Sequence, residues 1–483
     1  MPAGCSSPLS GSSEEKESVL SRIALQFTSW SERYIPDAYI FALLATLFIF
    51  AVSMTVAPAD IVLTSWGTGF WELIPFTMQM SLIIITGYVL ATAKPVFLLI
   101  VRLAELPKSP RGAVLLVALF SMLTSWFNWG FSLIISAILA REVGRRNSRA
   151  DYRALAAASF LGQGSMWAQG LSGSANLQMC TKEALQPGIR EVVARGGLIP
   201  SGLIGLEHTV FLWQTLLTVV VEIVLVGLVV WWFAPSEAFA KNAKALNINL
   251  GEFEAVDSKS ESLRKKTPGE WLEYSPLLNI LIGGIGLLYL LVTLARAPSL
   301  ISGITLNNLN FFFMMIGILL HWTPHRLMRA FKDATPSVWG AILQFPFYAG
   351  IAGMITGTGL NEKIAGFFVS ISNQVTFAPI IAIYSTILGV FVPSGGSKWV
   401  IEAPYVLTAA HDLKVHLGWV VSVYNLGEAL ANLIQPFWMV PVLAILGLKA
   451  RDVMGYTAVV FLVLLPAVLI MVTVLGMTLP YPL

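Results

Sequence analysis

The chain has 483 residues, of which 56% are hydrophobic and only 12% are charged. Soluble globular proteins carry about 25% charged residues, so this chain has too few charges to cover a water-facing surface, and much of its surface must face lipid. The net charge of +3 gives no indication of a nucleic-acid partner, and two cysteines far apart imply neither a disulfide framework nor a zinc site.

The N-terminal segment, residues 1–35, is predicted in two parts. The first 17 residues are polar and acidic, and they lack the basic start and apolar stretch of a secretory signal. Residues 19–34 place Leu20, Phe27 and Trp30 on one helical face. This pattern predicts an interfacial amphipathic helix that leads into the first span.

Apolar segments long enough to cross a bilayer, which takes about 20 residues, recur along the chain. Nine are predicted to cross it: 38–58, 72–92, 154–178, 205–234, 276–295, 305–322, 337–356, 418–448 and 455–479. Two further apolar stretches, 112–140 and 378–409, are each too long for one straight span and are broken in the middle. The breaks are Ser125-Trp126-Phe127-Asn128-Trp129-Gly130 and Pro393-Ser394-Gly395-Gly396-Ser397.

The distribution of basic residues predicts how the two broken stretches lie in the membrane. Cytoplasmic loops collect Lys and Arg, and basic clusters flank 112–140 on both sides. That stretch is therefore predicted to be a re-entrant hairpin from the cytoplasm, with its tip near Asn128. The flanks of 378–409 carry little basic charge, which predicts a hairpin from outside with its tip near Ser394. With a cytoplasmic N-terminus, the inner segments hold 23 of the 30 Lys and Arg residues.

The two hairpins belong to two halves that resemble each other weakly. Ile85-Thr86-Gly87 matches Ile355-Thr356-Gly357, and Trp129 matches Trp399, at an offset near 270. Because the basic clusters of the first half have no counterpart in the second, the halves are predicted to be inverted repeats, as in many secondary transporters. The predicted divisions are a first membrane repeat (36–234), a cytoplasmic linker (235–275), a connecting span (276–304) and a second, inverted membrane repeat (305–483).

The breaks also predict a binding site. Irregular backbone persists in a membrane only where it is buried in protein or lines a cavity, and a free helix N-terminus attracts an anion. Two opposed hairpin tips are therefore expected to bind a carboxylate, and two Gly-rich interrupted helices, near 162–176 and 425–436, are expected to complete the site. The predicted fold is an all-α polytopic membrane protein with inverted repeats, about nine spans, two re-entrant hairpins and two interrupted helices.

The candidate residues fall into two groups. The predicted substrate-binding residues are Asn128, Trp129, Gly130, Ser172, Ser174, Asn176, Ser394, Gly395, Gly396, Ser397, Lys398, Trp399 and Asn425. The predicted coupling-ion residues, which would take a proton or a sodium ion, are Glu402, Glu428 and Asn432.

Several of these residues also have a structural interpretation. Glycine and small polar residues allow close helix packing in membranes, and Trp129 and Trp399 would also suit an interfacial aromatic belt. Lys398 and Glu402, four residues apart, form either a structural ion pair or a pair that faces the substrate and the proton. Glu222, in the middle of a span, is either protonated at a helix interface or part of the transport path.

Four segments carry a family resemblance: Phe127-Asn128-Trp129-Gly130-Phe131, Gln344-Phe345-Pro346-Phe347-Tyr348-Ala349-Gly350, Pro393-Ser394-Gly395-Gly396 followed by Trp399, and Gln435-Pro436-Phe437-Trp438. With these segments the chain resembles the short-chain fatty acid transporter family over nearly its whole length after residue 30. The resemblance implies uptake of short-chain monocarboxylates such as acetoacetate or butyrate across a bacterial inner membrane. More distantly, the hairpin plan is similar to the ion transporter superfamily, whose members bind substrate and coupling ion at two hairpin tips and often form homodimers.

The predicted function is a secondary active transporter for a short monocarboxylate, coupled to protons or sodium and without another cofactor. Departures from the family pattern at Ser397-Lys398 and Glu402-Ala403 leave the identity of the acid and of the coupling ion open. A channel for small anions and a carrier of dicarboxylates are the alternatives. An enzyme is not expected, because no nucleophile–base set or metal-ligand spacing is found among five histidines and two cysteines.

Overall fold

The structure, a computed structural model, describes residues 38–235, 237, 240–251, 267–301, 303–392 and 394–483. Within these ranges the chain forms helices and loops and no strand. The tail and interfacial helix predicted for residues 1–35 lie outside the described residues, and so does part of the predicted linker.

The first half of the chain forms a series of helices that ends at residue 233. They are α2 (Ala38–Ser53), α3 (Ala59–Phe70), α4 (Ile74–Thr92), α5 (Lys94–Ala104), α6 (Pro110–Phe127), α7 (Trp129–Arg146), α8 (Tyr152–Ser165), η1 (Trp167–Gln169), α9 (Ser174–Cys180), α10 (Pro187–Val193), η2 (Arg195–Gly197), η3 (Leu206–His208) and α11 (Trp213–Phe233).

The second half repeats much of this order after two connecting helices. It comprises α12 (Pro268–Tyr274), α13 (Leu277–Arg296), α14 (Leu306–Leu320), α15 (Pro324–Ala334), η4 (Thr335–Val338), α16 (Trp339–Gly357), α17 (Leu360–Ile371), α18 (Phe377–Phe391), α19 (Gly395–Leu413), α20 (Leu417–Asn432), η5 (Phe437–Met439), α21 (Val440–Leu446) and α22 (Ala450–Gly476). The short helices α5, α10, α15 and α17 were not among the predicted elements, because each is too short or too polar to read as a span.

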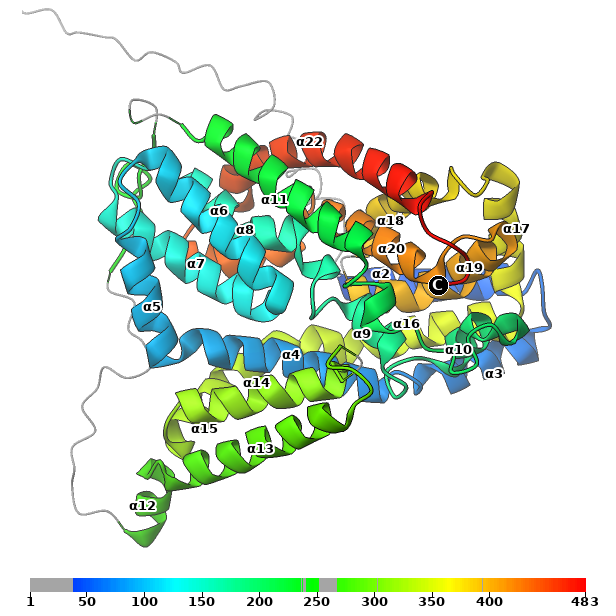
Figure 1. The fold of residues 1–483 in the computed structure, drawn as a ribbon, viewed down its shortest axis with the longest axis horizontal. Coiled ribbons are helices and arrows are strands. Elements are labelled where there is room, and N and C mark those ends of the chain that lie inside the picture. Colours follow the sequence, from blue (N-terminus) through cyan, green and yellow to red (C-terminus); the bar gives the residue numbers. More distant parts are fainter. Residues whose placement is uncertain (1–37, 236, 238–239, 252–266, 302, 393) are drawn as a thin grey trace, which may run out of the picture.

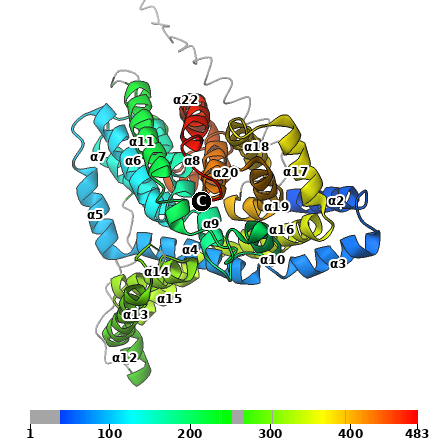
Figure 2. The same ribbon diagram turned by 45° about the vertical axis from the view of Figure 1, so that its right-hand side comes forward.

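Helices of each half pack against helices of the other half. Helix α4 of the first half packs on α14 and α15 of the second, and α16 of the second packs on α2 and α3 of the first. The contact between α3 and α16 is close enough to require glycine: a Cβ atom added to Gly69 would lie 2.8 Å from the Cα atom of Gly353. Figures 1 and 2 show α12 and α13 at the edge of the molecule, with α13 packed on α14.

All four predicted helix breaks are confirmed. Asn128 separates α6 from α7, and the chain between α18 and α19 is irregular at Ser394. Helix α8 is followed by η1 and an irregular turn before α9, and α20 is followed by a bend of 69° into η5 and α21. The two hairpins occupy opposite sides of the structure, α6–α7 on one and α18–α19 on the other (Figure 1).

The apolar helices fit a multi-pass membrane protein. Six helical segments of the described chain are long and apolar enough to cross a bilayer, or seven if the bent pair α20–α21 is one span. Two of the six join neighbouring helices into 34-residue segments, Ala59–Thr92 and Pro324–Gly357. The predicted number of nine crossings stays a prediction, since α2, α14 and α18 are apolar but shorter.

Segments that were predicted to share the cytoplasmic side meet at one end of the molecule. The Lys241 amide donates to Asp151 Oδ2 at 3.0 Å, which ties the start of the linker to the basic cluster after α7. The Arg141 Nη1 atom donates to the Ile445 carbonyl at 3.1 Å, close to the basic start of α22. These two hydrogen bonds agree with the prediction that the segments lie on the same side of the membrane.

Candidate functional site

The first hairpin tip is closed by its own hydrogen bonds. Asn128 is extended and caps α7, because its Oδ1 atom accepts from the Phe131 amide at 2.8 Å. The Trp129 amide donates to Ser172 Oγ at 3.0 Å. Asn128 and Ser172 therefore shape the tip, and the buried Nδ2 atom of Asn128 has no hydrogen-bond partner in the described part of the chain.

The second hairpin tip is more open. Ser394 precedes α19 in an extended conformation, and its side chain caps no amide of the helix. The Ser394 hydroxyl instead accepts from the Ser397 hydroxyl. The first amides of a helix have no partner within it, and no acceptor among the described residues meets those of Gly395 and Gly396. The tip at α19 thus leaves the amides of Gly395 and Gly396 unpaired, whereas side chains accept from two of the first three amides of α7, those of Trp129 and Phe131.

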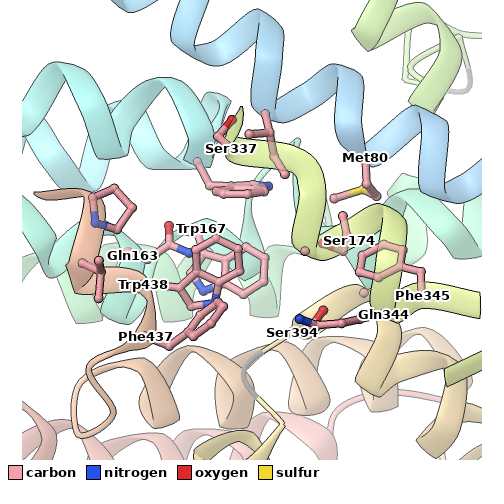
Figure 3. Close-up of a pocket in the computed structure, with 18 of the residues that line it drawn as sticks. Met80, Gln163, Trp167, Ser174, Ser337, Gln344, Phe345, Ser394, Phe437 and Trp438 are labelled. Carbon is pink, nitrogen blue, oxygen red and sulfur yellow. The ribbon is translucent and has the colours of Figure 1, made fainter. Parts of the chain in front are cut away.

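A cavity of about 490 Å³ lies between the two tips (Figure 3). Its lining comprises Met80, Ile84, Trp129, Gln163, Trp167, Ser174, Ser337, Trp339, Gly340, Ala341, Gln344, Phe345, Ser394, Gly395, Gly396, Phe437, Trp438, Val440 and Pro441. These residues are aromatic, aliphatic or neutral polar, and none of them is charged. The volume falls within the range of small-molecule sites, about 300–1,000 Å³.

Three buried polar atoms of lining residues have no hydrogen-bond partner within the described chain. The Nε1 atoms of Trp129 and Trp167 are buried and have no acceptor among the described residues, and the Oε1 atom of Gln163 has no donor. Figure 3 shows Gln163, Trp167 and Trp438 grouped together, with Gln344 and Ser394 beside each other to their right. A buried polar atom without a partner is costly, so these atoms suit contact with a bound polar group.

The indole ring of Trp167 lies directly against the second tip. A Cβ atom added to Gly395 would lie 2.4 Å from Trp167 Cη2, and one added to Gly396 would lie 2.9 Å from Phe76 Cζ and 3.1 Å from Ser174 Cβ. Glycine at both positions therefore lets the backbone of α19 approach the neighbouring side chains closely.

Behind the cavity, side-chain amides connect the two interrupted helices. The Asn425 Nδ2 atom donates to Asn176 Oδ1 at 2.8 Å, and Asn176 Nδ2 donates to the Ala168 carbonyl at 3.0 Å. The Asn432 Nδ2 atom donates to the carbonyl of Gln163 at 3.1 Å. These asparagines hold the irregular segments together and do not line the cavity.

The charged residues predicted for the site form a separate buried cluster. Lys398 Nζ lies 2.7 Å from Glu428 Oε2 and 3.4 Å from Glu402 Oε1, and all three side chains are fully buried. The Lys398 side chain is part of this cluster and does not line the cavity. Trp399 packs on Tyr424 at 4.7 Å between ring centroids, also outside the lining.

Glu222 is connected to the first interrupted helix. It is buried on α11 and accepts a hydrogen bond from Gln169 Nε2 at 2.9 Å, while Gln169 Oε1 accepts from the Thr218 hydroxyl at 2.7 Å. Gln169 belongs to η1, the irregular turn that also carries Trp167.

Five predicted substrate-binding residues line the cavity, namely Trp129, Ser174, Ser394, Gly395 and Gly396. Gly130, Ser397 and the other predicted residues lie outside its lining. The lining also includes eight polar or aromatic residues outside the predicted set, namely Gln163, Trp167, Ser337, Trp339, Gln344, Phe345, Phe437 and Trp438. The sequence marks some of them: Gln163 and Trp167 lie in the Gly-rich segment 162–176, Phe437 and Trp438 follow Pro436 at a helix break, and Gln344 lies two residues before Pro346 in α16.

Comparison with known proteins gives matches over most of the chain. A family model described as short chain fatty acid transporter matches residues 19–477. A protein of Escherichia coli K12 named for short-chain fatty acid transport is 37% identical over 449 residues, which cover 92% of this chain and 97% of that protein. A protein of the same name from Haemophilus influenzae is 34% identical over 451 residues, with 92% and 97% covered.

Two solved structures share the fold at low sequence identity. The YdaH transporter of Alcanivorax borkumensis superimposes with a TM-score of 0.62 at 15% identity, covering 92% of this chain and 99% of that one. MtrF of Neisseria gonorrhoeae, described among antimetabolite efflux pumps, gives a TM-score of 0.60 at 14% identity, with 95% and 99% covered.

Proposed function

The chain belongs to the short-chain fatty acid transporter family, and on this premise we propose that it carries short monocarboxylates across a bacterial inner membrane by cation-coupled alternating access. One observation carries the proposal: the cavity between the hairpin tips combines uncharged aromatic walls with unpaired N–H donors at one end. Such a cavity suits a small molecule with one anionic end and an apolar remainder.

The carboxylate would bind at the start of α19. The amides of Gly395 and Gly396 and the Nε1 atom of Trp167 are donors that have no partner among the described residues, and the partial positive charge of a helix N-terminus favours an anion. Hydrogen bonds to a charged group contribute about 1.5–3 kcal/mol each. Three donors of this kind would provide a binding site without a lysine or an arginine.

The acyl chain would then pack on the aromatic lining. Trp129, Phe345 and Trp438 lie around the same cavity. Burial of apolar surface contributes about 0.8 kcal/mol for each CH₂ group, so affinity is expected to rise with chain length until the cavity is filled.

The lining favours a monocarboxylate over a dicarboxylate. A second carboxylate would require a second set of donors or a cationic side chain, and the lining contains no Lys, Arg or His. An isolated charge in an apolar environment is strongly unfavourable. Succinate and similar acids are therefore expected to be poor substrates.

Two features support alternating access by a carrier over passage through a channel. The halves pack crosswise, as α4 and α16 do, which resembles the arrangement of inverted-repeat transporters. The buried cluster of Lys398, Glu402 and Glu428 lies behind the second tip, where a change in its protonation or ion occupancy could act on the binding site. We assign the N-terminus to the cytoplasm from the basic residues.

The test is uptake into proteoliposomes of straight-chain acids from two to six carbons, with succinate as the dicarboxylate. Saturable accumulation against a gradient is expected for the monocarboxylates. Accumulation of succinate alone would contradict the proposal, and rates that never saturate would indicate a channel.

A matched pair of variants tests the carboxylate donors. Trp167→Phe keeps an aromatic ring in the cavity wall but removes Nε1, and it is expected to raise KM by about tenfold or more, since loss of a hydrogen bond to a charge costs about 1.5–3 kcal/mol. Trp126→Phe makes the same change at another buried, unpaired indole of the first hairpin. Trp126 is not part of the lining, so its KM is expected to stay at the wild-type value; equal effects at both positions would contradict the assigned donor.

A further inference from the structure

The Lys398 ammonium occupies a position that is built like a cation site. Its Nζ atom donates to the Ser385 carbonyl at 2.6 Å and lies 2.7 Å from Glu428 Oε2 and 3.4 Å from Glu402 Oε1. Its fourth neighbour is the ring of Tyr424, at 4.7 Å from the centroid. Two carboxylates and a backbone carbonyl therefore converge on this position, and oxygen ligands of these kinds bind hard metal cations.

The surrounding helices leave room for this ammonium and little else. A Cβ atom added to Gly389 on α18 would lie 3.0 Å from Glu428 Oε2 and 3.5 Å from Lys398 Nζ. All three charged side chains are completely buried. A lysine stem fills the space between the helices, so a hydrated ion has no access to the same position while the ammonium is there.

The cluster carries one more negative than positive charge when all its groups are ionised. Its ionisable neighbours are the phenols of Tyr384, Tyr405 and Tyr424, on α18, α19 and α20. None of these supplies a positive charge. Glu402 Oε2 accepts from the Ser385 hydroxyl at 2.5 Å, whereas Glu402 Oε1 and Glu428 Oε1 have no hydrogen-bond partner among the described residues. An unbalanced buried charge is costly, so the cluster is suited to take up one proton.

We propose that Lys398 is a built-in cation that replaces a sodium ion, so that transport needs no sodium and is coupled to one proton shared by Glu402 and Glu428. The inference rests on the proposed function, because it names the coupling ion of that same site. It also selects one of the two ions that the sequence leaves open.

The cluster is connected to the tip that would bind the carboxylate. The Tyr424 hydroxyl donates to the Gly395 carbonyl at 2.5 Å, and the ring of Tyr424 contacts the Lys398 ammonium. A Cβ atom added to Gly395 would lie 3.2 Å from Glu428 Cγ, so only the tip backbone separates Glu428 from the cavity. Protonation of the cluster would neutralise the negative charge behind the tip and favour an arriving anion.

The first experiment measures butyrate uptake by the wild-type protein in proteoliposomes, with sodium and pH varied independently. Equal rates in sodium chloride and choline chloride, together with stimulation by an inward proton gradient, are expected. A requirement for sodium at constant pH would overturn the inference while leaving the proposed function intact. Absence of uptake for every short-chain acid would instead contradict the proposed function.

The second experiment needs no substrate. In Lys398→Ala/Glu402→Gln the ammonium is gone and one carboxylate remains for one sodium ion. Its melting temperature is expected to rise by about 3 °C or more between choline chloride and about 0.1 M sodium chloride, whereas that of the wild-type protein stays constant. The variant Lys398→Ala/Glu402→Gln/Glu428→Gln, without a carboxylate, is the matched control and is expected not to respond.

Lys363→Ala removes an exposed lysine of α17 and is expected to leave both measurements unchanged. If the double variant folds and its melting temperature does not depend on sodium, the position is no cation site and the inference is wrong. If the double variant does not fold, sodium-dependent stability of the wild-type protein still overturns the inference, because no sodium site should be open in that protein.

Discussion

Asn425 on α20 and Asn176 on α9 are joined by a hydrogen bond of 2.8 Å between their side-chain amides. Both side chains are buried. The bond links the interrupted helix of the first half to that of the second half, although 249 positions separate the two residues in sequence. The irregular segments that border the cavity therefore depend on each other for their conformation.

This link predicts non-additive effects of substitution. Asn176→Ala and Asn425→Ala each leave a buried amide without its partner and are expected to lower the free energy of unfolding by about 1–3 kcal/mol. The double variant is expected to lose less than the sum, with a coupling energy of about 0.5–3 kcal/mol. Thermal unfolding of the four proteins in detergent measures this coupling. Strictly additive losses would mean that the bond does not form.

A second prediction concerns the cap at the first hairpin tip. Asn128→Ala removes the acceptor of the Phe131 amide, which costs about 1 kcal/mol, and it is expected to abolish uptake while membrane insertion is retained. Asn128→Ser keeps a capping oxygen and is expected to be more stable than the alanine variant and to regain part of the uptake. Membrane fractionation and uptake measured side by side check both statements; equal activity of wild type and alanine variant would contradict them.

Close packing at the second tip gives a third prediction. Gly395→Ala would place a methyl group 2.4 Å from Trp167 Cη2, and overpacking of this kind costs about 1–3 kcal/mol. Because the ring would have to move into the cavity, loss of uptake is expected to exceed the loss of stability. Gly284→Ala on α13 is the control, since no atom lies within 4 Å of its added Cβ. Unchanged uptake by Gly395→Ala would remove the tip from the site.

The fourth prediction is a pH dependence of stability that arises at the start of α20. His416 precedes the helix, and its Nδ1 atom accepts from the Trp419 amide at 2.9 Å. Burial, and then the nearby His208, lower the pKa of His416 to about 4, from an unfolded value of about 6.5. The unfolded chain then binds more protons between these values, so stability is complete above about pH 6.5 and falls as the pH is lowered towards 4.

The contribution of His416 to that loss is at most about 3 kcal/mol. His416→Asn keeps a capping oxygen but does not titrate, so its melting temperature is expected to decrease less between pH 7 and pH 5 than that of the wild-type protein. Identical pH profiles of the two proteins would show that another group is responsible.

The helix breaks could be predicted from sequence because their cause is local. Asn128 and Ser394 lie in apolar stretches that are too long for one span. Each stretch is interrupted there by residues that favour turns and caps. The same reasoning located the interrupted helices, since Gly162 and Pro436 mark them directly. The short helices α5 and α15 escaped prediction because they are amphipathic and, at 11 residues each, lack the length of a span.

The partners of the site residues could not be predicted in the same way. Lys398 has Glu402 four residues away, but its shorter contact is to Glu428 on another helix, and only tertiary packing brings the two together. Trp167 lies in a segment rich in glycine and serine, which marks the segment but not this residue. Its role in the cavity follows from an indole N–H without a partner, which a sequence does not reveal.

The most direct test of the central claim, that short monocarboxylates bind between the hairpin tips, is substrate protection of a cysteine in the cavity. Ala341→Cys places a thiol in the lining of a protein whose Cys5 and Cys180 are replaced by serine, and Ala245→Cys places one on an exposed loop. Butyrate is predicted to slow maleimide labelling at position 341 at concentrations near its KM for uptake, and to leave labelling at position 245 unchanged. Labelling at position 341 that proceeds equally fast while butyrate is being transported would contradict the account.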